Sequence, residues 1–539
     1  MKKSFGIWAA ALIFLSMLFA NNPRAIPLMM TSGDKGWRNR PTDVFGIHRP
    51  FWTPNRIGNY LTNNGQFVVP NPAGRAGMEW PVGSGKTVAF ASGIWLGGIK
   101  NGEITSAVGE YATEFQPGAV TGHSSGVAGT PANPENSRFK VYMINDVDVA
   151  NPSGNPDYLN WPVVDGAPLN ANNKPHLLGT STAWAVFNDF NEALHTRLFK
   201  TKPLGVEVQM TAWAFDRADA FGDMMFFKYK FINKSGKNIS NAYAAFWADF
   251  DIGDARDLVG CDTTLSLAYQ YKKQSDAIYG ANPPAIGYNL LQGPIVPSPG
   301  GGANVAGRKV FGFKNLPMTA FDKFICGGPP PFSCPNTGVE AYQYMQGFNK
   351  FGQAIIDSTT GQTTRFWHPG DPVAGSGWLD GRPGDRHFLM SSGPFALADG
   401  DTQEVVGAII IAQGATGLES VKLLKQNVAL AQMAYQNQWL ITEVQEKPIR
   451  GPAAYALKQN YPNPFNPATT FEFTIPREEW VSLKIYNMLG EEMATVVEKK
   501  FSTGRYQVNW EPAGLTTGLY FYRLQAGDFV QTKKFTLLR

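Results

Sequence analysis

Five aspartates crowd the short stretch ADFDIGDARDLVGCD, which runs from Ala248 to Asp262. Their carboxylates repel one another unless a cation lies among them. Alternating Asp side chains around a glycine turn supply the oxygen ligands that Ca²⁺ requires. The stretch is not an EF-hand, because Gly253 falls at loop position five and Gly260 takes the place of the bidentate Glu. The sequence therefore predicts a calcium site whose ligands come from Asp249, Asp251, Asp254, Asp257 and Asp262.

The same stretch has a second interpretation, in which no metal takes part. Asp side chains commonly accept hydrogen bonds from nearby backbone N–H groups in turns. Arg256 could neutralise one of the carboxylates. A solvated turn, in which Asp side chains cap backbone N–H groups, is therefore an alternative to the calcium site.

Two short motifs match patterns of phosphate and serine chemistry but lack the required context. Gly83 to Thr87 (GSGKT) is the tail of a phosphate-binding loop, yet Trp80 stands where the first glycine belongs and the following run is strand-like. Gly122 to Gly126 (GHSSG) fits the nucleophile-elbow pattern, but no helix follows Ser124. We therefore expect neither a bound nucleotide nor a serine nucleophile.

The histidines and tryptophans give weaker signals. The six histidines have no H-x-x-H or H-E-x-x-H spacing, so a zinc peptidase is not predicted. A glycosidase needs two carboxylates facing each other across a cleft, and sequence spacing does not reveal such a pair. The 14 tryptophans could stack on sugars or fill a core. An exported hydrolase therefore remains the alternative to a binding protein.

The N-terminus predicts export from the cytoplasm. Lys2 and Lys3 precede an apolar run from Phe5 to Phe19, and small residues follow at Ala20 and Ala25. This is the pattern of a secretory signal peptide over residues 1–25. No later segment reaches the roughly 18 apolar residues of a membrane span. A net charge of +4 without a strong basic cluster argues against nucleic acid as a partner.

Three cysteines in an exported chain allow one intramolecular disulfide. Cys326 and Cys334 bracket the short loop CGGPPPFSC, and we expect them to pair. Cys261 is then left over, and we expect it to act as a small buried apolar residue.

The composition favours an all-β fold. Charged residues make up only 17% of the chain, whereas 57 Gly and 38 Pro provide many turns. Short apolar runs separated by Gly, Pro, Asn and Asp follow one another from about Asp43 to Thr416. We predict a mainly antiparallel β-sandwich over residues 26–417, as one or two domains, with a loop-rich insertion near 288–364.

A single long helix is predicted after this region, over residues 418–440. Val421, Leu424, Val428 and Tyr435 recur at intervals of three, four and seven residues, so one apolar stripe can pack on the sandwich. A polar linker is expected over residues 441–459.

The last segment, residues 460–539, predicts a second and smaller sandwich. It opens with NYPNPFNP, in which three prolines restrict the backbone. Alternating apolar residues then follow in FEFTI, VSLKIY and YQVNW, as in strands with one buried face. Several short strands within about 80 residues suit a small immunoglobulin-like antiparallel sandwich.

This C-terminal segment resembles the type A sorting domain of proteins exported by the type IX secretion system. The resemblance rests on NYPNPFNP, VSLKIYNMLGEEM, GRYQVNW, GLYFYRLQAG and the closing KKFTLLR. A departure is Trp510 followed by Glu511 and Pro512, where members of the family tend to carry Asp and Gly. The residues that match the sorting motif are Asn460, Tyr461, Pro462, Asn463, Pro464, Phe465, Asn466, Pro467, Gly490, Trp510, Gly518, Tyr520, Lys533 and Lys534.

The resemblance implies an export route. The partners it implies are an outer-membrane translocon, which recognises the folded C-terminal domain, and a sorting peptidase, which removes it. The product would be released or attached to the cell surface. For the remainder of the chain we expect a structural, adhesive or ligand-binding role, with surface glycan or other cell-surface proteins as partners, and with exported polysaccharide hydrolase as the alternative.

Overall fold

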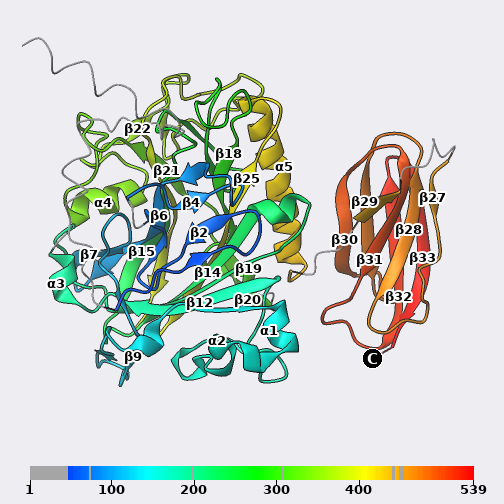
Figure 1. Ribbon diagram of the computed structural model, residues 1–539, viewed down its shortest axis with the longest axis horizontal. Helices are drawn as coiled ribbons and strands as arrows, with labels where there is room; N and C mark the ends of the chain where they lie inside the picture. The colour runs from blue at the N-terminus through cyan, green and yellow to red at the C-terminus, as the bar shows by residue number, and fades with distance from the viewer. Residues whose placement is uncertain are drawn as a thin grey trace, which may run out of the picture.

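The structure, a computed structural model, describes residues 46–71, 74–196, 198–305, 308–439, 444–447 and 454–538. The predicted signal peptide at residues 1–25 lies outside these ranges. Strands far outnumber helices among the described residues, which confirms the all-β prediction. Figure 1 shows a large β body followed by a smaller β sandwich near the C-terminus, and the two have separate hydrophobic cores.

The larger sheet of the main body has nine strands in the order β11-β12-β13-β14-β25-β18-β17-β16, with β8 also pairing with β12. All these pairings are antiparallel. The strands are β8 (Gln116–Pro117), β11 (Tyr142–Asn145), β12 (Ser181–Asn188), β13 (Val206–Ala214), β14 (Met224–Asn233), β16 (Leu258–Asp262), β17 (Leu267–Tyr271), β18 (Ala285–Gln292) and β25 (Thr402–Ala412).

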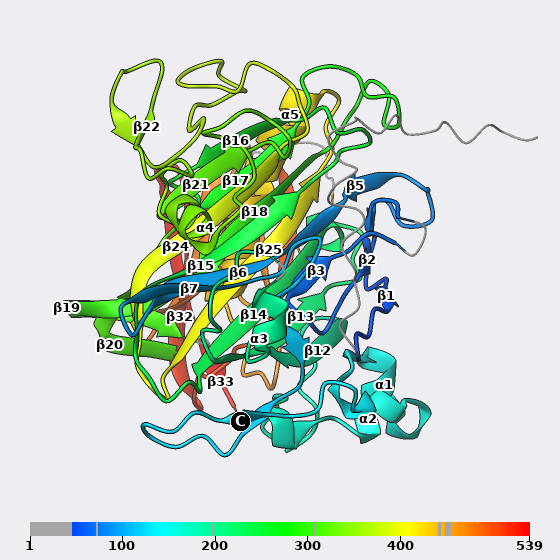
Figure 2. The ribbon, with the colours of Figure 1, turned by 90° about the vertical axis from the view of Figure 1, so that its left-hand side faces the viewer.

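The second sheet has six antiparallel strands in the order β21-β24-β15-β6-β3, with β7 also pairing with β6. Figure 2 shows β24, β15 and β6 running side by side. The strands are β3 (Gln66–Val68), β6 (Ala91–Lys100), β7 (Glu103–Val108), β15 (Ile239–Asp249), β21 (Ala320–Phe324) and β24 (His387–Leu397).

The main hydrophobic core lies between these two sheets. Phe227, Tyr229 and Phe231 of β14 point into it, as their alternation along the sequence predicts, and Phe246 of β15 meets Phe227 at 5.1 Å between ring centroids. Their neighbour Phe226 points the other way and joins a separate core beneath a helix. The body is therefore one sandwich with side chains interleaved between its sheets.

Helices cover the outer faces of both sheets. Helix α5 (Gly417–Gln436) begins at the N-cap Thr416 and packs Leu424 and Val428 on the nine-stranded sheet, along one flank of the body in Figure 1. The helix was predicted over residues 418–440, and the structure differs from this prediction only at the two ends of the helix. Helix α4 (Gly338–Met345) packs on the other sheet. The short helices are α1 (Asp146–Ala150), α2 (Pro156–Leu159), α3 (Glu192–His195), η2 (Ser137–Phe139), η3 (Pro152–Gly154), η4 (Val163–Asp165) and η5 (Ala220–Asp223).

The segment near 288–364, where a loop-rich insertion was predicted, contains strands and a helix as well as loops. It holds the hairpin of β19 (Ile295–Val305) and β20 (Arg308–Asn315), the edge strand β21, and α4. Its Gly and Pro residues suggested loops, but many of them lie within the long hairpin. The remaining short strands are β1 (Phe51–Trp52), β2 (Gly58–Tyr60), β4 (Met78–Glu79), β5 (Thr87–Ala89), β9 (Val120–Thr121), β10 (Thr130–Pro131), β22 (Ile355–Ile356) and β23 (Thr363–Thr364).

The C-terminal sandwich consists of two four-stranded sheets, β26-β31-β28-β27 and β30-β29-β32-β33. It begins before residue 460, because two strands from the predicted linker pair with β31 and β28. The strands are β26 (Val444–Lys447), β27 (Ala456–Leu457), β28 (Thr469–Ile475), β29 (Glu479–Tyr486), β30 (Glu492–Phe501), β31 (Gly504–Trp510), β32 (Gly518–Ala526) and β33 (Phe529–Leu537).

Candidate functional site

Three clusters of buried charged side chains meet around the segment Asp380–His387, which leads into β24. Gly384 of this segment exchanges two backbone hydrogen bonds with Asp257, at 3.1 and 3.0 Å. This pairing joins the segment to the aspartate-rich stretch that the sequence singled out. We name the clusters after Lys272, Lys323 and His387.

The Lys272 cluster holds part of the predicted calcium loop. The Lys272 ammonium is buried and lies 2.5 Å from Asp254, 3.6 Å from Asp257 and 3.0 Å from Asp276. A buried charge is tolerated when oppositely charged partners surround it. Lys272 thus supplies positive charge at the position where the sequence suggested a metal.

The pKa values in this cluster reflect burial and ion pairing. Burial alone would raise the pKa of Asp254, but hydrogen bonds from Arg256 and Lys272 outweigh it and lower that pKa to about 2. Burial raises the pKa of Asp257 well above its ordinary value, against the opposing effect of Lys272. Asp251, which is half-buried, helps to raise the pKa of Asp257.

The five aspartates predicted to bind calcium do not converge on one point. Asp254 and Asp257 face Lys272, whereas Asp249 contacts a tyrosine and a histidine described below. Asp262 lies 3.1 Å from Lys425 of α5. Together the five residues do not fit one ion, and calcium stays a prediction for this stretch. Sequence spacing also missed Asp276, because it follows on a later loop.

Replacing Lys272 with methionine should lower the free energy of unfolding by about 3 kcal/mol, because it leaves buried carboxylates without their partner. Urea unfolding at pH 7 measures this. The matched control is Lys425→Met, whose partly exposed pair with Asp262 should contribute less than about 1 kcal/mol. Equal losses in the two variants would contradict the role of Lys272. A lower melting temperature of the unmodified protein in EDTA would instead support calcium.

The Lys323 cluster centres on the buried carboxylate of Asp380. Lys323 of β21 lies 3.3 Å from Asp380 Oδ1, and the Nε atom of Arg386 lies 3.3 Å from Oδ2. The ring of His368 lies 3.8 Å from the same carboxylate. Lys323 and Arg386 therefore both contact the carboxylate of Asp380.

Two indole rings pack against this cluster. The rings of Trp367 and Trp378 lie 4.9 Å apart, and the Lys323 ammonium lies 5.0 Å from the centroid of Trp367. His368 packs against Trp378 at 4.7 Å. Lys323 and Trp367 keep part of their surface exposed, so they form the accessible edge of the cluster.

His368 is held in an unusual environment. It is only 5% exposed, neither ring nitrogen has a hydrogen-bond partner, and its backbone adopts the left-handed conformation with φ of 48°. Burial and the nearby Lys323 lower the pKa of His368 to about 3. Burial likewise lowers the pKa of Lys323 to about 8. The imidazole is thus neutral at physiological pH.

This environment predicts a loss of stability in acid. Below about pH 6.5 the unfolded chain binds a proton at His368 that the folded protein does not bind, so stability falls as pH falls toward 3. His368→Asn removes this titration and keeps the left-handed backbone, which Asn adopts readily. Between pH 6.5 and 5 the unmodified protein should lose about 1–2 kcal/mol more than the variant in urea unfolding. If the unmodified protein and the variant lose the same stability over this pH range, His368 has an ordinary pKa in the folded protein and the prediction is wrong.

The His387 cluster lies where β15 ends and β24 begins. Asp249 and His387 stand opposite each other in the strand pairing. The Tyr111 hydroxyl donates a hydrogen bond to Asp249 and lies 2.6 Å from Nε2 of His387. Burial and Asp249 raise the pKa of Tyr111 well above its ordinary value. Asp385 completes the cluster.

The cysteines lie close to this cluster. Cys326 and Cys334 form a disulfide bond, and both sulfur atoms lie near His387. Cys261 is free and buried, and burial raises the pKa of its thiol.

The two motifs set aside in the sequence lie in turns. GSGKT connects β4 to β5, and Lys86 lies over the ring of Tyr279 at 5.3 Å. Ser124 sits in an exposed turn closed by backbone hydrogen bonds with Val127. Neither shows the strand–loop–helix context that its chemistry requires.

In the C-terminal sandwich, the first residues of the sorting motif fasten the entering chain. The Asn460 side chain is buried and donates hydrogen bonds to Thr469 Oγ1 at 2.9 Å and to the Pro462 carbonyl at 3.1 Å. The Tyr522 hydroxyl accepts from the Asn460 N–H and donates to the Lys458 carbonyl. These contacts attach the start of the motif to the C-terminal sandwich.

The remaining motif residues divide between core and surface. Phe465, Trp510 and Tyr520 lie in the hydrophobic core. Gly490, with φ of 81°, ends the turn between β29 and β30, and Gly518 begins β32. The exposed members are Tyr461, Pro462, Asn463, Pro464, Asn466, Pro467 and Lys534, whereas Lys533 is half-buried.

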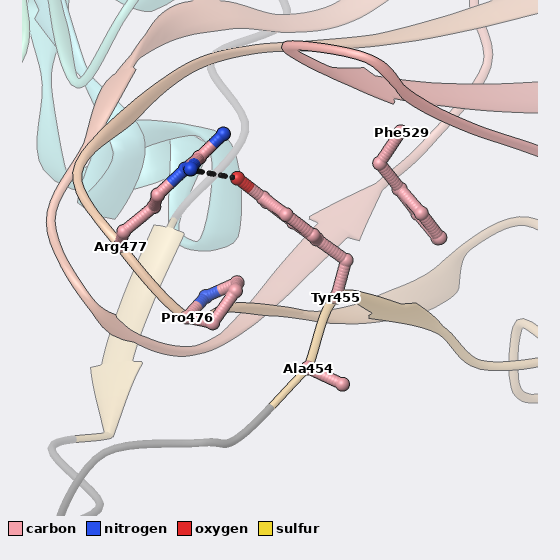
Figure 3. Close-up of a pocket in the computed structure, with 5 residues that line it drawn as sticks. All are labelled: Ala454, Tyr455, Pro476, Arg477 and Phe529. Atoms are coloured by element: carbon pink, nitrogen blue, oxygen red, sulfur yellow. Dashed lines mark hydrogen bonds between the residues drawn. The ribbon is translucent and has the colours of Figure 1, made fainter.

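A pocket of about 530 Å³ lies on the C-terminal sandwich. Figure 3 shows that Ala454, Tyr455, Pro476, Arg477 and Phe529 line it. The rings of Tyr455 and Phe529 stack at 5.2 Å, and Arg477 donates a hydrogen bond to the Tyr455 hydroxyl at 3.2 Å. The cationic and aromatic groups are thus held against each other.

Comparison with known proteins bears on the C-terminal sandwich alone. No curated protein matches the chain. Among solved structures, a polysaccharide lyase aligns with 92% of this chain at 8% identity and a TM-score of 0.24, a likeness too low to carry an argument. The alignment spans 46% of the lyase, so this chain covers about half of its length.

Residues 459–537 match the model of the secretion system C-terminal sorting domain. This match confirms the resemblance found in the sequence. Among the described residues, no helix combines the length and apolar character needed to cross a membrane. The C-terminal sandwich is therefore a type IX secretion system sorting domain, and the chain is exported to the cell surface or the extracellular space.

Proposed function

We propose that the exported main body is a non-enzymatic binding protein that attaches to an acidic glycan through the Lys323 cluster. The observation that carries this proposal is the pair of basic side chains on one carboxylate beside an indole ring. Lys323 and Arg386 share the single carboxylate of Asp380. A sugar carboxylate could accept a charge-assisted hydrogen bond from the partly exposed Lys323.

The aromatic edge supports the same ligand. Trp367 is partly exposed and its face already lies against the Lys323 ammonium. An acidic sugar that reaches the exposed part of this edge would contact Trp367 and Lys323 together. A glycosidase would need two carboxylates across a cleft. Asp380 is instead buried and paired with two cations, which favours binding over hydrolysis.

The export route completes the proposal. The predicted signal peptide directs the chain out of the cytoplasm, the outer-membrane translocon recognises the C-terminal sandwich, and a sorting peptidase removes it. The main body then acts as an adhesive or structural protein at the cell surface. Support for this route comes from the sorting domain at residues 459–537.

Binding of oligogalacturonide to the full mature chain tests this function by calorimetry, with neutral galactose oligomers as the reference ligand. Lys323→Met should weaken oligogalacturonide binding at least about tenfold, because it removes the charge-assisted contact to the sugar carboxylate. Lys425→Met, a lysine outside the cluster, should leave the affinity unchanged.

Equal affinity for charged and neutral oligomers, or an unchanged affinity in Lys323→Met, would contradict the proposal. The same samples can be assayed for new reducing ends. Their appearance would favour the alternative of an exported polysaccharide hydrolase.

A further inference from the structure

The His387 cluster combines an imidazole, two carboxylates and a phenol from three separate parts of the chain. Asp249 ends β15, His387 begins β24, and the two residues face each other in the strand pairing. Asp385 precedes His387 by two residues, and Tyr111 comes from the loop after β7. Asp249 and His387 are buried, whereas Tyr111 and Asp385 are half-buried.

The ligand atoms of this cluster converge. One ligand atom from each of Asp249, Asp385 and His387 lies within 4.8 Å of the other two. Nε2 of His387 is 3.7 Å from Oδ1 of Asp249. A tetrahedral ion with bonds of about 2.0–2.2 Å keeps its ligand atoms roughly 3.4 Å apart. The cluster can therefore close around one ion with small side-chain movements.

We propose that Asp249, Asp385 and His387 bind a divalent transition metal, namely zinc. Imidazole nitrogen suits zinc, whereas calcium takes oxygen ligands alone. The set differs from the predicted calcium site, since it shares only Asp249 with it. The proposal is independent of glycan binding by the Lys323 cluster.

The surroundings hold the imidazole in position. The His387 ring stacks on Phe324 at 5.8 Å with an angle of 4° between the planes, and on Trp247 at 5.9 Å. Strand pairing fixes its backbone against Asp249. A ligand that is oriented before metal binding loses little freedom when the ion arrives.

The redox state of the nearby Cys326–Cys334 disulfide must be known in any test of metal binding. Cys326 and Cys334 also lie within 4.8 Å of a His387 ring nitrogen. Joined in a disulfide, the sulfurs are not thiolates, and the carboxylates provide the remaining ligands. If the disulfide were reduced, the two thiolates could replace the carboxylates as zinc ligands.

Titration of the full mature chain with zinc chloride, with the disulfide intact, tests the site. Calorimetry should show one equivalent bound, and zinc should raise the melting temperature. Asp385→Asn should weaken binding at least about tenfold. The matched control is Asp254→Asn, which alters a partly buried aspartate of the neighbouring Lys272 cluster and should bind zinc like the unmodified protein.

Asp385 is half-buried, so its Asn variant should fold, and circular dichroism together with the melting temperature without zinc checks this. His387→Gln provides a second variant with the same expected loss. The proposal is overturned by a lack of saturable zinc binding in the micromolar range, by equal weakening in Asp254→Asn, or by binding that appears only after reduction of the disulfide.

Discussion

Charge buried at one end of the main sandwich must be neutralised locally, and this constraint organises the loops there. Lys272 meets three aspartates, and Asp380 meets Lys323 and Arg386. Water cannot screen these groups well, so each depends on partners placed within a few ångströms. The loops at this end of the sandwich are held in position because their buried charged side chains must pair with one another.

The segment Asp380–His387 links the clusters. Asp380 and Arg386 belong to the Lys323 cluster, whereas Asp385 and His387 belong to the His387 cluster. Gly384 pairs with the backbone of Asp257, which faces Lys272. A shift of this segment would therefore disturb all three clusters at once. We infer that it acts as a rigid part of the body, although it contains no long element of secondary structure.

Much of the fold followed from local patterns. The alternation of Phe227, Tyr229 and Phe231 predicted the buried face of β14, and the stripe containing Leu424 and Val428 predicted α5. Both patterns depend only on neighbours in sequence. The sorting domain was likewise recognisable because its motif lies within one short segment.

The charged clusters were less predictable because their members come from distant segments. Asp249 and Asp262 are close in sequence, but β15 lies in the six-stranded sheet and β16 in the nine-stranded sheet, so strand pairing carries them apart. Conversely, Lys323 and His368 are brought together only by tertiary packing. No spacing rule links such residues, and even Asp385, two residues before His387, gave no recognisable ligand pattern.

Amide hydrogen exchange across Asp380–His387 tests the central claim most directly. If buried charges hold this segment rigidly, its amides, and that of Gly384 in particular, should exchange as slowly as those of the core strand β15. Exchange as fast as in the exposed turn around Ser124 would show that the segment opens freely, and would contradict the view that the three clusters form one organised end of the sandwich.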